Sequence, residues 1–467
     1  MKLIYGVKDK PRFSQVIVFA IQQLLAIMAA TLVVPVIING NISDMIAEGS
    51  LAWTLDKPMS STVALFGAGV GTLVYLLFTK FRSPVFLGSS FAFLGSMTAA
   101  FAGASSMALG YVGLILGAVC AGLVYVIIAI IVKFAGVKWI NKLMPPVVIG
   151  PTVTIIGLSL AGNAIGDLQT APAGGDTKVA LVCGLVTLAV TIISSVYGKK
   201  MMKLIPFIIG ILAGYAVAAI FTVIGNVAGI DTFKVINFSS FETLVADGVG
   251  LKTFITLPEF TFLNALGGFD EIDGGYIATV AVAYVPVAFV VFAEHLADHK
   301  NISSIIESDL LEDPGLHRTL LGDGVGSMAG AFFGGCPNTT YGESVGCVAI
   351  TGNASVITII TTAFAAIAIS FLSPFVAFVN SIPSCVMGGV CMALYGFIAV
   401  SGLKMVQKVD LEHNANLFTV SVILIAGIGG LSISFGKVSI TSIACALILG
   451  ILTNLLVNKS RKTDKPN

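Results

Sequence analysis

Charged residues are scarce in this chain, and their scarcity excludes an ordinary soluble protein. Asp, Glu, Lys and Arg make up 10% of the 467 residues, whereas soluble domains carry about 25%. Apolar residues make up 56%, and there are 51 Gly in addition. Too few polar side chains remain to cover a soluble protein of this size. The composition therefore predicts a membrane protein in a lipid bilayer, and the net charge of +1 gives no general attraction to nucleic acid.

Residues that hold metals or disulfides are also few. The chain has seven Cys and four His, with no Cys-x-x-Cys pair and no Cys/His ligand spacing. Most of the Cys lie in apolar runs, where a free thiol behaves as a small hydrophobic group. We therefore expect no metal and no cofactor. The first apolar run lacks a small-residue cleavage site, so it is predicted to be a transmembrane helix rather than a signal peptide.

Apolar runs long enough to cross a bilayer, which takes about 20 residues, recur along the whole chain. Together they predict an all-α polytopic membrane protein with fourteen transmembrane segments. The clear spans lie near 14–38, 61–79, 106–132, 177–197, 204–228, 276–298, 354–379 and 438–457. Shorter spans, or spans interrupted by Gly and Pro, lie near 84–101, 145–165, 319–335, 339–351, 383–403 and 415–433.

The distribution of basic residues supports this count. If both termini are cytoplasmic, twenty of the 25 Lys and Arg lie in inner segments and only five in outer ones. Such an excess is typical of cytoplasmic loops. Acidic residues gather instead in the longest outer connection, residues 229–275. We therefore expect a multi-pass protein of the cell membrane with both termini cytoplasmic.

Two short echoes suggest an internal repeat. Pro145–Gly150 resembles Pro383–Gly388 at an offset of 238 residues, and Gly88–Phe91 resembles Asn338–Tyr341 at an offset of 250. Fourteen spans then divide into two halves of seven, and because seven is odd the second half is inverted. Broken helices at corresponding positions of inverted halves indicate a transporter site near the membrane midplane. The predicted parts are a first repeat at 1–228, an extracellular connection at 229–275 and a second repeat at 276–467.

Four ionisable residues lie within or beside the predicted spans: Glu294, Asp298, Asp323 and Glu343. Such residues are costly in lipid, so they face the protein interior or a cavity and are functional candidates. Glu294 and Asp298 are four residues apart and share a helix face. Two carboxylates so close resist ionising together, so one of them is expected to bind a proton. The alternatives are an ordinary helix end for Glu294 and Asp298, and a local helix bend for Asp323.

The segment that contains Glu343 is suited to a flat polar ligand. Pro337 and the Asn-Thr-Thr run that follows it disfavour continuous helix. Irregular backbone at membrane depth is tolerated only where it is buried or lines a cavity. A carboxylate there accepts hydrogen bonds from ring N–H groups, and free backbone amides donate to ring carbonyls. The segment therefore favours a planar ligand with alternating donors and acceptors.

These motifs resemble those of the nucleobase–ascorbate transporters, and within them the bacterial uracil and xanthine permeases. The resemblance covers nearly the whole chain, and the run from Glu343 to Gly352 is similar to the family signature that follows the tenth span. The strongest matches are Phe86–Phe93, Ala293–His295, Asp309–Arg318 and Pro337–Gly346.

The resemblance implies a core domain of spans one to four and eight to eleven, and a gate domain of spans five to seven and twelve to fourteen. It also implies short strands in spans three and ten. At matching positions, Glu294 and Glu343 would hydrogen-bond the base. The backbone of Phe91 and Gly342 would contact its edges, and Tyr341 would shape the pocket. Movement of the core against the gate would alternate access. A homodimer is a further expectation.

Two residues depart from the family pattern. Ser344 stands where the family often has Asn, and Asp298 stands where the uracil permeases have a His that is thought to help proton coupling. Asp also binds protons, so Glu294 and Asp298 are the predicted coupling residues. Glu343, preceded by Tyr341 and Gly342, favours uracil over xanthine. The resemblance thus predicts a proton-coupled symporter that imports a nucleobase, with uracil favoured and a purine such as xanthine as the alternative.

Three other classes fit less well. An anion carrier of the same fold predicts cationic groups or helix N-termini at the site, and Glu294 and Glu343 oppose it. An intramembrane enzyme of the aspartyl protease type needs paired Asp motifs, which the sequence lacks. A channel needs a ring-forming selectivity segment, and none is visible. We therefore expect a transporter and no enzyme.

Overall fold

The computed structural model describes residues 3–136, 139, 144–171, 173–199, 201–246, 248–435 and 438–457. The C-terminal segment 458–467, which was predicted to be cytoplasmic, lies outside the described residues. The elements before the connecting segment are α1 (Phe13–Ala47), α2 (Ser61–Phe78), β1 (Leu87–Ser89), η1 (Phe91–Phe93), α3 (Leu94–Ala102), α4 (Met107–Ala135), α6 (Pro146–Ser159), α7 (Ala161–Leu168), α8 (Thr177–Tyr197), α9 (Met201–Leu204) and α10 (Pro206–Ala228).

The connecting segment and the second half contain further helices and strands. The connecting segment has η2 (Asp231–Phe233), α11 (Ser239–Val245), α12 (Leu251–Phe254), α13 (Thr261–Ala265) and η3 (Leu266–Glu271). The second half has α14 (Gly274–Ile306), η4 (Leu311–Gly315), α15 (Leu316–Gly334), β2 (Asn338–Thr340), α16 (Gly342–Thr351), α17 (Val356–Ile369), α18 (Ser373–Ser381), α19 (Ser384–Val406), α20 (Asn414–Ile428), β3 (Ile433–Phe435), β4 (Val438–Ile440) and α21 (Ser442–Val457).

Apolar helices form most of the molecule, as the composition predicts. Within the described residues, eight helices are long and apolar enough to cross a membrane, and four shorter apolar helices accompany them. A helix satisfies its backbone hydrogen bonds internally, which is what a lipid environment demands. The chain is therefore a multi-pass membrane protein with an all-α architecture. The total of fourteen spans stays a prediction, because several of these segments are short or interrupted.

The observed helices differ from the predicted spans at several places. The span predicted at 354–379 is wrong as a single helix, because α17 ends at Ile369 and α18 begins at Ser373. At the break, Leu372 forms an antiparallel bridge with Ile255 of the connecting segment. Conversely, the segments near 319–335 and 383–403, predicted to be short or interrupted, form the continuous helices α15 and α19.

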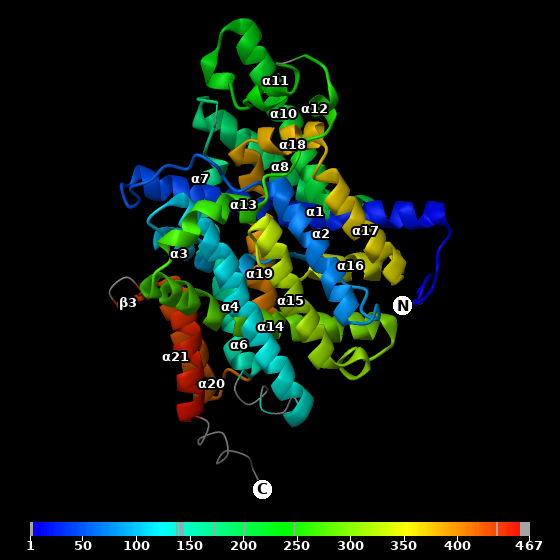
Figure 1. Cartoon of the computed structure of the whole chain (residues 1–467), viewed down its shortest axis with the longest axis vertical. Coiled ribbons are helices and arrows are strands. Elements are labelled where there is room, and N and C mark those ends of the chain that lie inside the picture. Colours follow the sequence, from blue (N-terminus) through cyan, green and yellow to red (C-terminus); the bar gives the residue numbers. More distant parts are fainter. Residues whose placement is uncertain are drawn as a thin grey trace.

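The connection at 229–275 is folded rather than an open loop. Its helices α11 and α12 pack against α18 and lie together at one end of the molecule (Figure 1). The amide of Thr256 donates to the carbonyl of Phe371 (2.9 Å), and the hydroxyl of Ser373 donates to the carbonyl of Lys252 (2.9 Å). These bonds tie the connecting segment to the break between α17 and α18. The helix α21 runs toward the opposite end (Figure 1).

The two halves meet through close helix packing and through a strand pair. Helix α2 packs along α15, and a side chain at Gly67 would collide with the carbonyl oxygen of Gly330. Small residues let membrane helices approach closely in this way. Strands β1 and β2 pair antiparallel, with Gly88 opposite Thr339 and Ser89 opposite Asn338. An offset of 250 residues maps each of these pairs onto the other, so the register has the symmetry of an inverted repeat.

Candidate functional site

Helix α14 carries two pairs of polar side chains on neighbouring faces. Glu294 and Asp298 are four residues apart, and so are His295 and His299. Residues spaced by four lie on one face of a helix, and successive residues differ by about 100°. Glu294 and Asp298 are half-buried, whereas both His side chains are fully buried. The predicted sharing of a face by Glu294 and Asp298 therefore holds, because α14 continues well past both.

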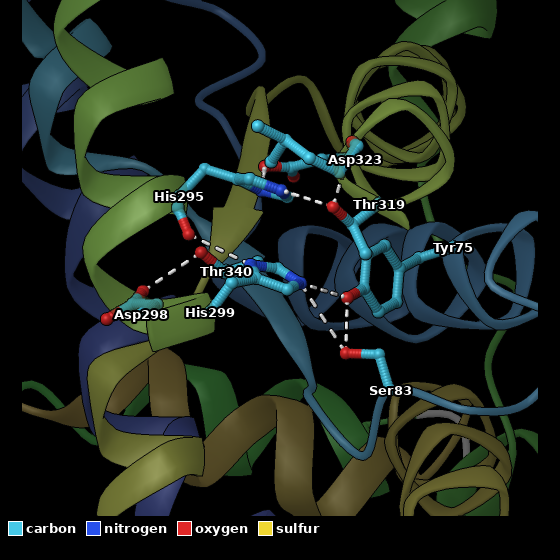
Figure 2. A network of polar contacts seen from close by, with 9 residues as sticks. Tyr75, Ser83, His295, Asp298, His299, Thr319, Asp323 and Thr340 are labelled. Atoms are coloured by element: carbon cyan, nitrogen blue, oxygen red, sulfur yellow. Dashed lines mark hydrogen bonds and ion pairs between the residues drawn. The ribbon is translucent and has the colours of Figure 1, made fainter. Parts of the chain in front are cut away.

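Asp298 connects α14 to the second strand of the crossing pair. Its Oδ2 accepts a hydrogen bond from the hydroxyl of Thr340 at 2.9 Å. A side chain at Gly342 would lie 3.9 Å from Oδ1 of Asp298, so this carboxylate also stands beside the start of α16. In Figure 2, Asp298 points toward Thr340 and away from the two His rings. The carboxylates of Asp298, Asp323 and Glu343 are the charged neighbours of Glu294.

Glu343 lies in the first turn of α16, directly after β2. Strand β2 ends at Thr340, Tyr341 is still extended, and the helix begins at Gly342. Negative charge near a helix N-terminus is favourable, because the free amides of the first turn point toward it. Glu343 is half-buried and Gly342 is exposed, although both belong to a predicted membrane span. The structure thus leaves Gly342 and the carboxylate-bearing Glu343 partly accessible at one place.

Ser344 holds the start of α16 in place. Its hydroxyl accepts hydrogen bonds from the side-chain amide of Gln23 on α1 (2.5 Å) and from the backbone amide of Phe86 (2.9 Å). All three residues are buried. The backbone amide of Tyr341 also donates to the carbonyl of Phe86 at 3.2 Å. The residue that departs from the family pattern therefore links α1, the segment before β1 and the helix of Glu343.

Tyr341 holds the strand crossing together. Its hydroxyl donates to the carbonyl of Ser89 at 2.7 Å, and its ring occupies the space where a side chain at Gly88 would stand. Tyr341 is buried, with 4% of its surface exposed. The ring of Tyr341, which was predicted to shape the pocket, is therefore packed against β1. It can influence a pocket only by fixing the positions of the two strands.

Phe91 reaches across to a helix of the predicted gate domain. It is half-buried, at the start of η1. Its ring and that of Tyr395 on α19 are 6.2 Å apart between centroids, in an edge-to-face arrangement. Tyr395 was not identified from the sequence, because an aromatic residue in an apolar span has the same pattern as a lipid-facing or core residue. Only the fold brings it to Phe91.

The two buried His residues of α14 form a network with α2 and α15 (Figure 2). On the α15 side, Nδ1 of His295 lies 2.7 Å from Oδ2 of Asp323, and Nε2 lies 3.0 Å from the hydroxyl of Thr319. The rings of His295 and His299 stack with centroids 4.0 Å apart. Asp323 is buried within the continuous helix α15. The helix-bend alternative for Asp323 is therefore wrong, and its carboxylate binds a His.

His299 extends the network toward α2. Its Nδ1 lies 2.9 Å from the carbonyl oxygen of His295, which can only accept, so this nitrogen carries a proton. Its Nε2 lies 2.7 Å from the hydroxyl of Tyr75, which itself lies 2.6 Å from Oγ of Ser83. Buried polar groups need such partners. The network ties one face of α14 to α15 and α2, and Asp298 on a neighbouring face accepts a hydrogen bond from Thr340 of β2.

A large cavity lies at the end of the molecule where the connecting segment and α18 pack. It has a volume of about 1430 Å³ and lies between α1, α2 and α3 on one side and α7, α18 and α19 on the other. Four carboxylates and one Lys are among its lining residues: Asp44, Asp56, Asp167, Glu259 and Lys57. Glu294, Asp298 and Glu343 do not line it. We call this acidic cavity the vestibule; it is separate from the carboxylates of α14 and α16.

Comparison with known proteins agrees with the fold and with the motifs. The xanthine/uracil permease family model matches residues 14–434. The uracil permease of Bacillus caldolyticus is 37% identical over 459 residues, which cover 98% of this chain and 95% of that protein. The uracil permease of Bacillus subtilis (strain 168) is 36% identical over 471 residues, covering 99% and 97%. The uracil permease of Escherichia coli (strain K12) is 35% identical over 455 residues, covering 97% and 93%.

Solved structures of lower identity share the fold. The transmembrane domain of the cyanobacterial bicarbonate transporter BicA has a TM-score of 0.57 at 16% identity, covering 96% of this chain and 99% of that chain. The murine solute carrier 26 family member A9 anion transporter has a TM-score of 0.60 at 12% identity, covering 97% and 69%. At these identities the likeness concerns the fold alone. The family match and the long alignments show that this chain belongs to the xanthine and uracil permeases of the nucleobase–ascorbate transporter family.

Proposed function

We propose that this chain is a proton-coupled symporter that imports uracil across the cell membrane by alternating access. Membership of a permease family makes it a transporter rather than an enzyme, and the curated relatives named above are uracil permeases over nearly their whole length. The observation that carries the substrate class is the partial exposure of Glu294, Asp298 and Glu343, together with that of Gly342, around the start of α16.

Uracil presents ring N–H donors and ring carbonyl acceptors in one plane. In the proposed complex, the carboxylates of Glu294 and Glu343 accept from the N–H groups, and backbone groups of Phe91 and Gly342 contact the ring edges. Hydrogen bonds to charged acceptors are the stronger kind. Tyr341 supports the site from behind, through its bond to the carbonyl of Ser89. The carboxylates of Glu294 and Glu343 oppose an anion here, although the N-terminus of α16 alone would suit one.

The vestibule supports a neutral substrate. Its lining carries four carboxylates against one Lys, which gives it a negative potential at neutral pH. Such a potential disfavours the entry of anions and raises the local concentration of cations, including protons. The solved neighbours that carry anions therefore share the fold of this chain without supporting an anionic substrate for it.

Proton coupling is assigned to Glu294 and Asp298. They share one face of α14 with a third carboxylate, Glu343, beside them. In a site shielded from water, neighbouring carboxylates resist ionising together, so one proton is shared between them. The network of His295 and His299 positions this face, because it ties the neighbouring face of α14 to α15 and α2.

Uptake of labelled uracil by purified protein in liposomes tests the proposal. We expect uptake to be driven by an inward proton gradient and to resist competition by xanthine. Asp298→Asn is expected to retain uracil exchange while losing the stimulation by the gradient. Uptake that ignores the gradient in the wild type would remove proton symport. Full competition by xanthine would move the substrate to the purines.

A further inference from the structure

Asp323 is the fully buried member of the four acidic residues that lie in or beside the membrane spans. It stands in the middle of α15 with 1% of its surface exposed. Its Oδ2 lies 2.7 Å from Nδ1 of His295, which is also buried. Its Oδ1 has no hydrogen-bond partner among the residues that the structure describes. An ionised carboxylate in such a place is costly unless its charge is balanced.

No basic side chain pairs with Asp323. Among the described residues, the ion pairs of Lys and Arg are those of Arg82 with Asp313 and of Lys234 with Asp231. The ionisable groups around Asp323 and His295 are Glu294, Asp298 and His299 on α14, Tyr125 on α4, Tyr75 on α2 and Glu343 on α16. None of these is a permanent cation. Only a bound proton can therefore balance the charge of Asp323.

The partner of the other ring nitrogen shows how His295 is protonated (Figure 2). The hydroxyl of Thr319 donates to the carbonyl oxygen of Leu316 at 3.0 Å. A hydroxyl has one proton to donate, so Thr319 is the acceptor in its contact of 3.0 Å with Nε2 of His295. Nε2 of His295 therefore carries a proton.

A further proton must lie between His295 and Asp323. Without it, the lone pairs of an unprotonated Nδ1 and an ionised Oδ2 would face each other at 2.7 Å. The contact is attractive when one proton lies between the two atoms, either on Nδ1 or on Oδ2. In both forms the two side chains hold one proton more than an ionised Asp and a neutral His, and their net charge is zero. This is the balance that the burial of Asp323 demands.

His299 needs no additional proton. Its Nδ1 donates to the carbonyl oxygen of His295 at 2.9 Å. Its Nε2 faces the hydroxyls of Tyr75 at 2.7 Å and of Ser83 at 3.5 Å, each of which can donate. A neutral imidazole thus has a partner at both nitrogens. The extra proton belongs to His295 and Asp323 alone.

This proton is separated from the partly exposed acids of α14. Asp298 accepts from Thr340 and points away from the two His rings (Figure 2). In the described part of the chain, no hydrogen bond joins Asp323 or the ring of His295 to Glu294 or Asp298. The hydrogen-bonded side chains around the two rings are themselves buried: Thr319, Tyr75 and Ser83. The proton therefore has no hydrogen-bonded path to the exposed face.

We propose that His295 and Asp323 form a second proton site, which keeps its proton through the transport cycle while Glu294 and Asp298 exchange theirs. The retained proton makes the tie between α14 and α15 electrically neutral and so holds the partly exposed acids in position. That the site binds a proton does not depend on the proposed function. That this proton is not transported rests on the proposed proton coupling.

Solid-state 15N NMR of the wild-type protein in lipid tests the proton site. The chain has four His, of which only His295 is followed by Leu, so combined labelling of His and Leu assigns its ring without a substitution. We expect Nε2 to be protonated, and the ring to keep this state between about pH 6 and pH 8, where an ordinary His loses its proton. An unprotonated Nε2 beside a protonated Nδ1, at any pH in this range, would overturn the retained proton.

Matched substitutions distinguish the two proton sites. The uptake of labelled uracil into liposomes is measured with and without an inward proton gradient for Asp323→Asn and Asp298→Asn. Asp323→Asn is expected to slow uptake several-fold and to keep the wild-type stimulation by the gradient, whereas Asp298→Asn loses it. Loss of stimulation in Asp323→Asn would overturn the proposal, because the transported proton would then bind here.

The two measurements separate failure of this proposal from failure of the proposed function. Wild-type uptake that ignores the gradient removes proton coupling, but the ring state of His295 is still read by NMR. The NMR measurement also needs no variant, so it decides the proton site even where Asp323→Asn does not fold.

Discussion

Residues 87–102 and residues 338–351 are each built as a short strand followed by a helix, and the two strands pair antiparallel. By the offset of 250 residues that relates the strands, Phe93 of the first segment is the equivalent position to Glu343 of the second. Phe93 is buried and stacks on Tyr284, with ring centroids 5.5 Å apart. Glu343 is half-buried at the start of its helix. The two segments therefore share a backbone conformation but carry side chains of different chemistry at equivalent positions.

The next residue repeats the contrast. Leu94 is buried among apolar side chains, whereas Ser344 accepts hydrogen bonds from Gln23 and from the amide of Phe86. At these two positions the first copy serves packing, and we propose that the second serves binding. An inverted repeat supplies two crossing backbones, and placing the carboxylate in only one of them limits the cost of charged groups in lipid.

Exchanging the acid of the second segment gives the largest expected effect. Glu343→Gln keeps the size of the side chain and removes the charged acceptor, whose hydrogen bond contributes about 2–3 kcal/mol. We expect uracil uptake to fall about 100-fold with unchanged protein in the membrane, measured in liposomes beside an immunoblot. The matched change in the first segment, Phe93→Leu, should lower stability by about 1–3 kcal/mol and leave uptake near normal at permissive temperature. Equal losses of uptake in the two variants would show that the two segments do not differ in their roles.

Filling the crossing point gives the next largest effect. In Gly88→Ala the added methyl group would overlap the ring of Tyr341, so the ring and its bond to Ser89 must shift. We expect uptake to fall about tenfold, because overpacking of this kind costs about 1–3 kcal/mol. Gly95→Ala is the control, since nothing lies within 4 Å of a side chain at Gly95. Normal uptake in Gly88→Ala would show that the two strands do not need this close approach.

Loosening the start of α16 should have a moderate effect. Ser344→Ala leaves the amides of Gln23 and Phe86 without their shared acceptor in a buried place, which costs about 1–3 kcal/mol. We expect the apparent KM for uracil to rise several-fold with a smaller change in the maximal rate. Ser344→Thr keeps the hydroxyl and should restore most of the affinity. A maximal rate that falls while KM stays constant would point to a role other than positioning.

Removing one outlying hydroxyl of the His network should have the smallest effect. Tyr75→Phe removes two buried hydrogen bonds, to His299 and to Ser83. Nε2 of His299 and Oγ of Ser83 already lie 3.5 Å apart and can pair with each other, so we expect a net cost of only about 1 kcal/mol. We expect a small fall in the unfolding temperature with uptake retained. His299→Leu removes both ring nitrogens and should reduce uptake as well, because the rotation of α14 is then less well fixed. Uptake that survives His299→Leu unchanged would contradict the positioning role.

Much of the fold could be predicted from composition and from local pattern. Long apolar runs predicted the long helices, and Pro337 with its polar neighbours predicted irregular structure at the start of the tenth span, where β2 lies. The break between α17 and α18 was missed, although Pro374 in the first turn of α18 is a sequence signal for a helix start. What the sequence does not show is that the residues at the break pair with Ile255 and Thr256, which lie far away in the chain.

The sequence reveals those residues of the candidate site whose types are rare in membrane spans, and it does not reveal those whose types are common there. Acidic residues in apolar spans are few, so Glu294, Asp298, Asp323 and Glu343 were found from the sequence alone. Buried His residues beside them, and the aromatic ring of Tyr395, have many ordinary roles in a membrane protein. Their partners lie far away in sequence, as Tyr75 does from His299, and only the fold brings them together.

Equilibrium binding of labelled uracil to the purified protein tests the central claim most directly, because it needs neither a gradient nor a transport cycle. Wild-type protein and Glu343→Gln are compared in detergent, with Glu259→Gln of the vestibule as the matched carboxylate control. We predict saturable binding to wild type and to Glu259→Gln, and a loss of about 100-fold or more in Glu343→Gln. Equal affinity in wild type and Glu343→Gln would contradict the assignment of the uracil site to the start of α16.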